Sequence, residues 1–124
     1  MEIKALVTDS NSKVRKNLTR SLKELGIKNV VEATDGCQAI EMLQKGKYDI
    51  VFAEYNTKTA QGDELVSSIR RTDAKMPIVV MAPQSKQVTE LKQSCPTASS
   101  YLTTPFTTDQ LKKTVAQCVP SIAG

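Results

Sequence analysis

The sequence predicts a doubly wound α/β domain in which five parallel strands alternate with five helices. Short β-rich runs alternate with helical patterns along the whole chain, and two of these runs, at 50–53 and 78–81, are apolar without alternation. Uninterrupted apolar runs are typical of strands covered on both faces, which favours a parallel sheet with right-handed crossovers. Because 124 residues suit one ordinary domain, we expect a single domain over residues 1–124.

The strands and the first helix follow from local patterns. The first helix is the clearest, because Ser12 is a candidate N-cap and apolar residues recur from Val14 to Leu25 at spacings of four, four and three. Gly26 then ends this helix in a left-handed conformation. The five expected strands are 3–8, 30–32, 49–53, 78–82 and 101–103.

The remaining helices are expected at four places. Helical patterns cover 36–45, where Gly46 is the stop signal, and 62–71. The segment 85–95 offers only two apolar residues for a core stripe, so we expect a short or mobile helix there. The last helix starts after Pro105 with Thr107 and Gln110 as a capping box.

Composition excludes several classes of protein. No apolar run approaches the roughly 20 residues that span a bilayer, and the first residues lead straight into a strand without a signal peptide. The chain has no histidine, which excludes Ser-His, Cys-His and His-metal chemistry. Three cysteines without CxxC spacing favour free thiols in a reducing cytoplasm, and we expect Cys37, Cys95 and Cys118 in or near the core.

Polar and small residues follow the ends of four predicted strands. In an open parallel sheet the chemistry collects beyond the carboxyl ends of the strands, so these residues should converge on one pocket. They are Thr8, Asp9 and Ser10, then Glu54, Tyr55 and Asn56, then Ala82 and Pro83, and finally Thr104 and Pro105.

Five segments carry a family resemblance. In chain order they read LVTDSNSKVRKNL, YDIVFAEYN, QGDELV, PIVVMAP and YLTTPF. With near-ungapped spacing over essentially all 124 residues, the chain resembles the receiver domain of bacterial response regulators, above all the free-standing chemotaxis type. The resemblance implies a flavodoxin-like receiver fold and a place in two-component signal transduction, also called a phosphorelay.

The resemblance also implies a site, from which this sequence departs. A receiver takes a phosphoryl group from a histidine kinase onto an aspartate, with Mg²⁺ held by an acidic pair and the phosphoryl oxygens held by a Thr or Ser and a Lys. Here the acceptor position is Glu54, whose extra methylene misplaces the attacking oxygen by about 1 Å, worth on the order of 10²-fold in rate. The other matching positions are Asp9 and Ser10 for the acidic pair, Asn56 for a backbone metal ligand, Ala82 for the hydroxyl and Thr104 for the lysine.

These departures predict a degenerate receiver. We expect no enzyme activity and no catalytic residue, no cofactor beyond Mg²⁺ held weakly by Asp9, and no phosphorylation of the usual kind. Three states of Glu54 stay open: a domain that no longer switches, an active-like state in which a cation such as Lys58 meets the fixed charge, and residual phosphorylation at an altered site. Tyr101 matches the family's aromatic switch, which we interpret as a half-buried structural tyrosine, and Thr104–Pro105 is expected to be cis.

The expected partners are signalling proteins. Family members signal through the fourth helix, the fifth strand and the fifth helix, and the thin core stripe of 85–95 suggests a helix whose position is easily biased. Whether a histidine kinase acts on this chain stays open. Lys13, Lys16, Arg20 and Lys23 form one stripe of the first helix, which suits a solvated face, an acidic partner or a nucleic acid. With five aromatic residues and none among these cations, we do not expect nucleic acid, nor a membrane.

Overall fold

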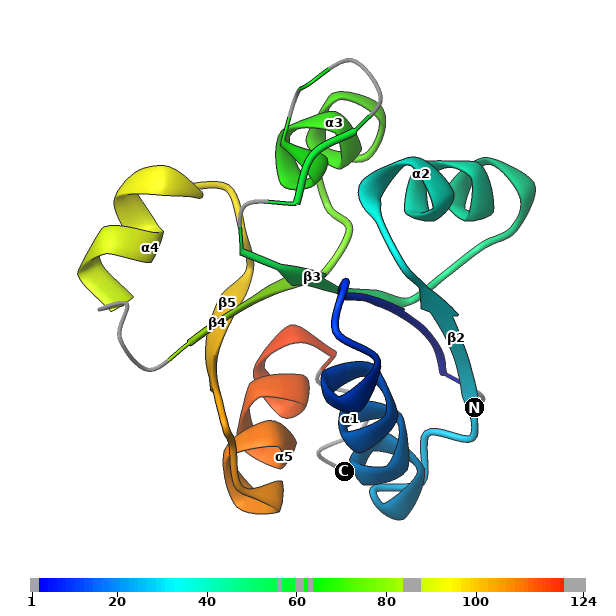
Figure 1. The fold of residues 1–124 in the computed structure, drawn as a ribbon, viewed down its shortest axis with the longest axis vertical. Helices are drawn as coiled ribbons and strands as arrows, with labels where there is room; N and C mark the ends of the chain where they lie inside the picture. The colour runs from blue at the N-terminus through cyan, green and yellow to red at the C-terminus, as the bar shows by residue number, and fades with distance from the viewer. Residues whose placement is uncertain (1–2, 56, 60–61, 63, 84–87, 120–124) are drawn as a thin grey trace.

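The computed structural model of the chain describes residues 3–55, 57–59, 62, 64–83 and 88–119. Strands and helices alternate without exception over this part of the chain (Figure 1). Their bounds are β1 (Lys4–Thr8), α1 (Ser12–Glu24), β2 (Asn29–Ala33), α2 (Gly36–Lys45), β3 (Ile50–Glu54), α3 (Leu65–Thr72), β4 (Ile78–Pro83), α4 (Val88–Ser94), β5 (Ser100–Thr104) and α5 (Thr108–Cys118).

The five strands form one parallel sheet in the order β2-β1-β3-β4-β5. Helices α1 and α5 cover one face, and α2 and α3 cover the other, with α4 beside the edge formed by β4 and β5 (Figure 1). This is the doubly wound α/β architecture predicted from the sequence, and each strand agrees with its expected range to within one residue at either end. None of the described helices is long and apolar enough to cross a membrane.

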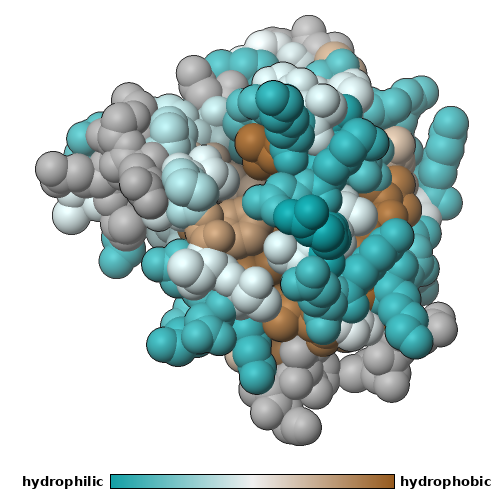
Figure 2. Space-filling view, turned by 60° about the horizontal axis from the view of Figure 1, so that its bottom comes forward, coloured by the Kyte–Doolittle hydropathy of each residue, from teal (hydrophilic) through white to brown (hydrophobic). Residues whose placement is uncertain are grey.

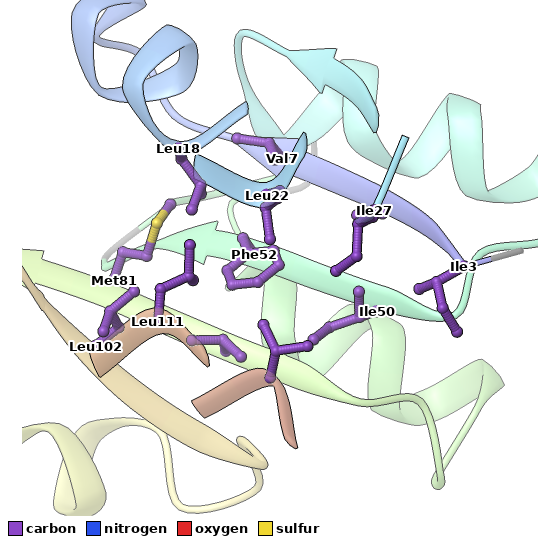
Figure 3. Close-up of a cluster of buried hydrophobic side chains, with 13 residues drawn as sticks. Ile3, Val7, Leu18, Leu22, Ile27, Ile50, Phe52, Met81, Leu102 and Leu111 are labelled. Carbon is purple, nitrogen blue, oxygen red and sulfur yellow. The ribbon is translucent and has the colours of Figure 1, made fainter. Parts of the chain in front are cut away.

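Two hydrophobic clusters, one on each face, hold the helices to the sheet. Successive strand residues point to opposite faces, so Phe52 enters one cluster and its neighbour Val51 the other. Phe52 is fully buried among Leu18 and Leu22 of α1 and Leu111 of α5, with Met81 beside them (Figure 3). This packing explains why β3 and β4 read as continuous apolar runs.

Four helix ends were predicted from one or two residues each. Gly46 is the C-cap of α2 as predicted, but the prediction for the start of α1 was wrong. The N-cap of α1 is Asn11 rather than Ser12, since the Asn11 Oδ1 accepts the N–H groups of Lys13 at 2.9 Å and Val14 at 3.4 Å. A longer side chain one residue earlier reaches the free N–H groups of the first turn. Gly26 after α1 has the predicted positive φ of 97°, and the Thr107–Gln110 capping box of α5 is confirmed.

The third helix begins at Leu65 rather than at 62. A short antiparallel bridge joins Lys58 to Glu64, and the Leu65 N–H is donated to the Thr57 carbonyl at 2.9 Å, so the backbone groups of these residues are already paired. Those groups are therefore not available to a helical turn. Helix α4 is short, as expected.

The cysteine prediction holds for two of the three thiols. Cys95 is buried and Cys118 is partly buried, but Cys37 is exposed. Cys37 follows Gly36 in the first turn of α2, and it is the neighbouring Gly36 and Ala39 that are buried. The helical pattern located the turn correctly but not the side of the helix that Cys37 occupies.

A single guanidinium joins α3 to the segment before β5. Arg70 donates to the carbonyls of Thr97 at 2.8 Å, Met76 at 2.6 Å and Asp73 at 3.3 Å, and to the Ser99 hydroxyl at 3.2 Å. Burial lowers the pKa of Arg70, with the charge of Asp73 acting in the opposite direction. The Arg70 side chain therefore links α3 to the loop that follows it and to the segment before β5.

Arg70→Ala should lower the free energy of unfolding by about 1–3 kcal/mol, because charge-assisted hydrogen bonds are lost and the partly buried Met76 carbonyl loses a donor. Urea denaturation measures this loss. Arg71→Ala in the same helix is the matched control and should cost clearly less, since the bond from Arg71 to the Ser68 hydroxyl is exposed. Equal losses in the two variants would contradict the role given to Arg70.

Candidate functional site

The carboxyl ends of the strands bring the predicted site residues to one edge of the sheet. Strands β1 and β3 are neighbours, with Thr8 opposite Ala53, so Asp9 and Ser10 follow β1 close to the end of β3. Strands β4 and β5 end side by side, with Ala82 opposite Thr103 and Pro83 opposite Thr104. Asn56 lies outside the described residues.

The carboxylate of Glu54 is held by Ser10. The backbone N–H of Ser10 donates to Glu54 Oε1 at 3.1 Å, and the Ser10 hydroxyl lies 3.1 Å from Oε1 and 3.3 Å from Oε2. These bonds join positions 44 residues apart, at the ends of β1 and β3. Two donors on one residue therefore hold the Glu54 carboxylate against the loop that precedes α1.

Asp9 is the second carboxylate of the site and is almost completely buried, with 5% of its surface exposed. Its Oδ1 accepts the N–H of Asn11 at 2.8 Å. Burial raises the pKa of Asp9, and so does the charge of Glu54, while the Asn11 N–H and the Arg15 guanidinium act in the opposite direction. In the folded protein the negative charge on Asp9 is therefore unfavourable overall.

Arg15 belongs to the site, although the sequence did not point to it. Its Nη1 donates to the backbone carbonyl of Asp9 at 2.7 Å, and its Nε donates to Glu32 Oε1 at 3.2 Å. Only 13% of the Arg15 side chain is exposed. Arg15 thus fastens the β1–α1 loop to β2, and its place within a run of basic residues gave no signal that distinguished it from its neighbours.

Ala82 and Thr104 lie on the other side of Glu54 in the sheet order. Ala82 is buried, and Thr104 Oγ1 donates to the Ala82 carbonyl at 3.4 Å. The Thr104–Pro105 peptide is cis, as expected. Neither side chain carries a charge, so this part of the edge contributes no counter-charge for a phosphoryl group.

Lys58 does not take the place of the missing lysine. Its Nζ lies 3.9 Å from Glu64 Oε1, and the two residues also share a backbone bridge. The hypothesis that Lys58 meets the charge of Glu54 is therefore not supported, because the cation is paired with the carboxylate that precedes α3.

Tyr101 is partly buried, and its hydroxyl donates to the backbone carbonyl of Cys95 at 2.5 Å. Burial raises the pKa of Tyr101, with a contribution from Cys95. The thiol of Cys95 lies 3.6 Å from Glu64 Oε2, and burial, reinforced by Glu64, raises its pKa to about 11. The contact between Cys95 and Glu64 joins positions 31 residues apart, so no local pattern in the sequence signalled it.

Asp9 and Glu54 are the two carboxylates that a divalent cation could use. Among the residues that the structure describes, no three His, Cys, Asp or Glu residues are grouped as metal ligands. Asp9 already accepts an N–H, and both oxygens of Glu54 face the Ser10 hydroxyl. Mg²⁺ is usually held by one or two carboxylates and several waters, and here an ion would compete with Ser10 for the Glu54 oxygens.

Comparisons with known proteins agree on one family. A family profile described as the response regulator receiver domain matches residues 5–116. Chemotaxis protein CheY-3 of Vibrio cholerae is 30% identical over 113 residues, which is 90% of this chain and 87% of that protein. Chemotaxis protein CheY of Pseudomonas aeruginosa is 25% identical over 124 residues, 98% of this chain and 100% of that protein.

A solved structure gives the same fold. The chemotaxis protein CheY4 of Vibrio cholerae superposes with a TM-score of 0.81 at 23% identity, covering 96% of this chain and 100% of that chain. At this identity the likeness shows the fold alone. It agrees with the order of strands and helices described above.

Asp9→Asn should raise the free energy of unfolding at pH 7. A carboxyl whose pKa is raised on folding favours its protonated form, so its ionisation destabilises the fold as the pH rises through and above 3.8, the pKa taken for an unperturbed Asp. Asparagine keeps an oxygen for the Asn11 N–H but removes the charge. Thermal unfolding at pH 7 and at pH 3 measures the effect. The gain should be present at pH 7 and absent at pH 3, and a loss at pH 7 would contradict it.

Proposed function

The chain belongs to the response regulator receiver domain family and is thus a receiver domain of two-component signalling, and from this premise we propose that it is a regulatory module that acts by binding other proteins without the usual phosphoryl transfer. In this proposal it is not an enzyme and has no catalytic residue. Its place of action is the cytoplasm, which suits three free thiols.

The hydrogen bonds from Ser10 to Glu54 carry this proposal. The resemblance puts Glu54 at the acceptor position and Ser10 where a second acidic residue would hold the metal. Here the two side chains are bonded to each other, which leaves the Glu54 carboxylate facing the β1–α1 loop. Phosphoryl transfer requires an oxygen placed in line with the incoming phosphorus, and a carboxylate held by two donors is not placed for that attack.

The charges around Glu54 support the same conclusion. An incoming phosphoryl group would meet the negative charges of Asp9 and Glu54, while Thr104 offers no positive charge. Arg15 is committed to Glu32 and the Asp9 carbonyl, and Lys58 to Glu64. Because catalysis of phosphoryl transfer is mostly electrostatic stabilisation and positioning, a site without counter-charges gives little rate enhancement. We accordingly propose that Mg²⁺ is not a resident cofactor.

Among the three open states of Glu54, the geometry favours a domain that no longer switches. An active-like state needs a cation beside the negatively charged Glu54 carboxylate. That carboxylate is instead hydrogen-bonded to the Ser10 hydroxyl. The proposed surface for partners is formed by α4, β5 and α5, where family members signal. Tyr101 of β5 supports a fixed form of this surface, because its hydroxyl is bonded to Cys95 just after α4.

The test is a ¹⁵N amide spectrum titrated with Mg²⁺ and then with Mg²⁺ plus beryllofluoride, which imitates a phosphoryl group. The proposal predicts unchanged resonances at Asp9, Glu54 and Thr104 at about 10 mM Mg²⁺, well above what a working oxygen-ligand site requires. Incubation with acetyl phosphate followed by intact-mass measurement should show no added phosphoryl group.

The positive control is a variant with the four substitutions Ser10→Asp, Glu54→Asp, Ala82→Thr and Thr104→Lys. Restoring two carboxylates, a hydroxyl and a cation should return Mg²⁺-dependent shifts with beryllofluoride. Saturable shifts in the unmodified chain, spreading from Glu54 to Tyr101, would instead establish the alternative function, a phosphoaccepting regulator with an altered residue set.

A further inference from the structure

A hollow of about 410 Å³ lies between α2 and α3, which are neighbours on one face of the sheet (Figure 1). We call it the α2–α3 hollow. Its apolar lining consists of Ile40 and Leu43 of α2 and the buried Ile69 of α3, and its polar lining of Gln44, Thr59, Ser68, Arg71 and Thr72. Protein pockets that bind small molecules have volumes of about 300 to 1,000 Å³ and combine apolar side chains with a few polar groups. The α2–α3 hollow has both properties.

A hollow of about 460 Å³ beside α1, on the other side of the sheet, has a different lining. All six of its lining residues are polar and five of them are charged, with both signs present: Lys16, Thr19, Arg20, Lys23, Glu24 and Glu32. Figure 2 shows the side of the molecule below the sheet of Figure 1, where long hydrophilic side chains stand among the uncovered hydrophobic surface. Interspersed charges of both signs are typical of a solvated surface, so the hollow beside α1 does not indicate a ligand.

The Thr59 hydroxyl is the feature of the α2–α3 hollow that points to a bound molecule. Only 8% of the surface of Thr59 is exposed, and its Oγ1 has no hydrogen-bond partner among the residues that the structure describes. The backbone carbonyl of Thr59 is paired, since it accepts the Gly62 N–H at 3.0 Å. A buried polar atom without a partner is unfavourable. A hydrogen-bonding group of a molecule in the hollow would supply the missing partner.

Backbone contacts hold Thr59 in the wall of the hollow. Gly36, the first residue of α2, lies against the backbone that precedes Thr59, and a Cβ at this position would collide with the Lys58 carbonyl. Lys58 is also joined to Glu64, the N-cap of α3, by a backbone bridge and an ion pair. The residue before Thr59 is thus held between the starts of α2 and α3. The place of the hydroxyl therefore follows from the fold and not from an exposed loop.

The charges around the hollow favour an uncharged ligand. Arg71 is the one charged residue among the described lining residues, and it lies in the last turn of α3. The lining residues come from the C-terminal halves of α2 and α3, where the carbonyl groups carry partial negative charge. A cation in the last turn offsets this partial charge, and Arg71 also donates to the Ser68 hydroxyl at 3.1 Å. Neither sign of ligand charge is therefore favoured.

We propose that the α2–α3 hollow binds a small uncharged molecule that has an apolar body and one hydroxyl or carbonyl group. The apolar body contacts the three aliphatic side chains of the lining, and the polar group forms a hydrogen bond with the Thr59 hydroxyl. A second hollow, of about 490 Å³, shares Leu43, Ile69 and Thr72 with the first, so a longer apolar body has room to extend. The described lining includes no residue from the carboxyl ends of the strands, so binding here is independent of the proposed function.

Benzyl alcohol is the test ligand, since it combines an apolar ring with one hydroxyl group. Amide shifts of the full chain at pH 7 locate the binding site, and their titration gives the dissociation constant. We expect saturable shifts at 40–44, Thr59 and 68–72, with a dissociation constant of about 1 mM, which is reasonable for so small a ligand. Benzoate and benzylammonium carry opposite charges on the same ring, and each should bind at least about threefold more weakly than the alcohol.

Thr59→Val tests the hydrogen bond, because valine has the shape of threonine without the hydroxyl. The variant should fold, since it removes an unpaired buried polar atom. Benzyl alcohol should bind about three- to tenfold more weakly to it, whereas toluene, which has no hydroxyl, should bind the variant and the unmodified chain equally. Thr19→Val is the matched control. The Thr19 hydroxyl also has no partner among the described residues, but Thr19 lies in α1, away from the hollow, so its replacement should change neither affinity.

Three outcomes would overturn the proposal. They are the absence of saturable shifts at the residues that line the hollow, an equal effect of Thr59→Val on the binding of benzyl alcohol and toluene, and tighter binding of benzoate or benzylammonium than of benzyl alcohol. The first and the third are measured on the unmodified chain, so they decide the proposal even where the variant does not fold.

Discussion

Parallel strands end at one edge of their sheet, and the charges collected there must be compensated. In this chain β1 and β3 bring Asp9 and Glu54 to that edge, while the cations Arg15 and Lys58 are paired with Glu32 and Glu64. Ser10 compensates part of the negative charge of Glu54, because its N–H and its hydroxyl both donate to that carboxylate. The raised pKa of Asp9 shows that the compensation is incomplete. The departures from the family's site residues, which lead us to propose that usual phosphoryl transfer is lost, therefore lie where two carboxylates meet.

A chain of contacts leads from this edge to the proposed signalling surface. Thr57 donates its N–H and its hydroxyl to the Glu54 carbonyl and accepts the N–H of Leu65, which places Glu64 at the start of α3. The Glu64 carboxylate contacts the Cys95 thiol, and the Cys95 carbonyl accepts a hydrogen bond from the Tyr101 hydroxyl. These contacts are continuous from β3 to β5, and coupling along them would further require an element with two arrangements.

The regular elements could be predicted from the sequence because their signals are local. Apolar runs located β3 and β4, and Thr107 with Gln110 located the start of α5. The contacts that define the site join distant positions, and no local pattern records that Ser10 bonds Glu54. The predicted start of α3 failed for the same reason, since a bridge between Lys58 and Glu64 took up the backbone groups that a helical turn would use. The family resemblance supplied the site positions, and the geometry supplied which of those residues contact one another.

The most direct test of the central claim is a double-mutant cycle between Ser10 and Glu54. Ser10→Ala, Glu54→Ala and the double variant are compared by urea denaturation at pH 7, which separates the contact from the effects of each residue alone. The account predicts a favourable coupling energy of about 1 kcal/mol, typical of a hydrogen bond to a charged group at a partly exposed site. A coupling energy below about 0.3 kcal/mol would mean that the two side chains do not hold each other in solution.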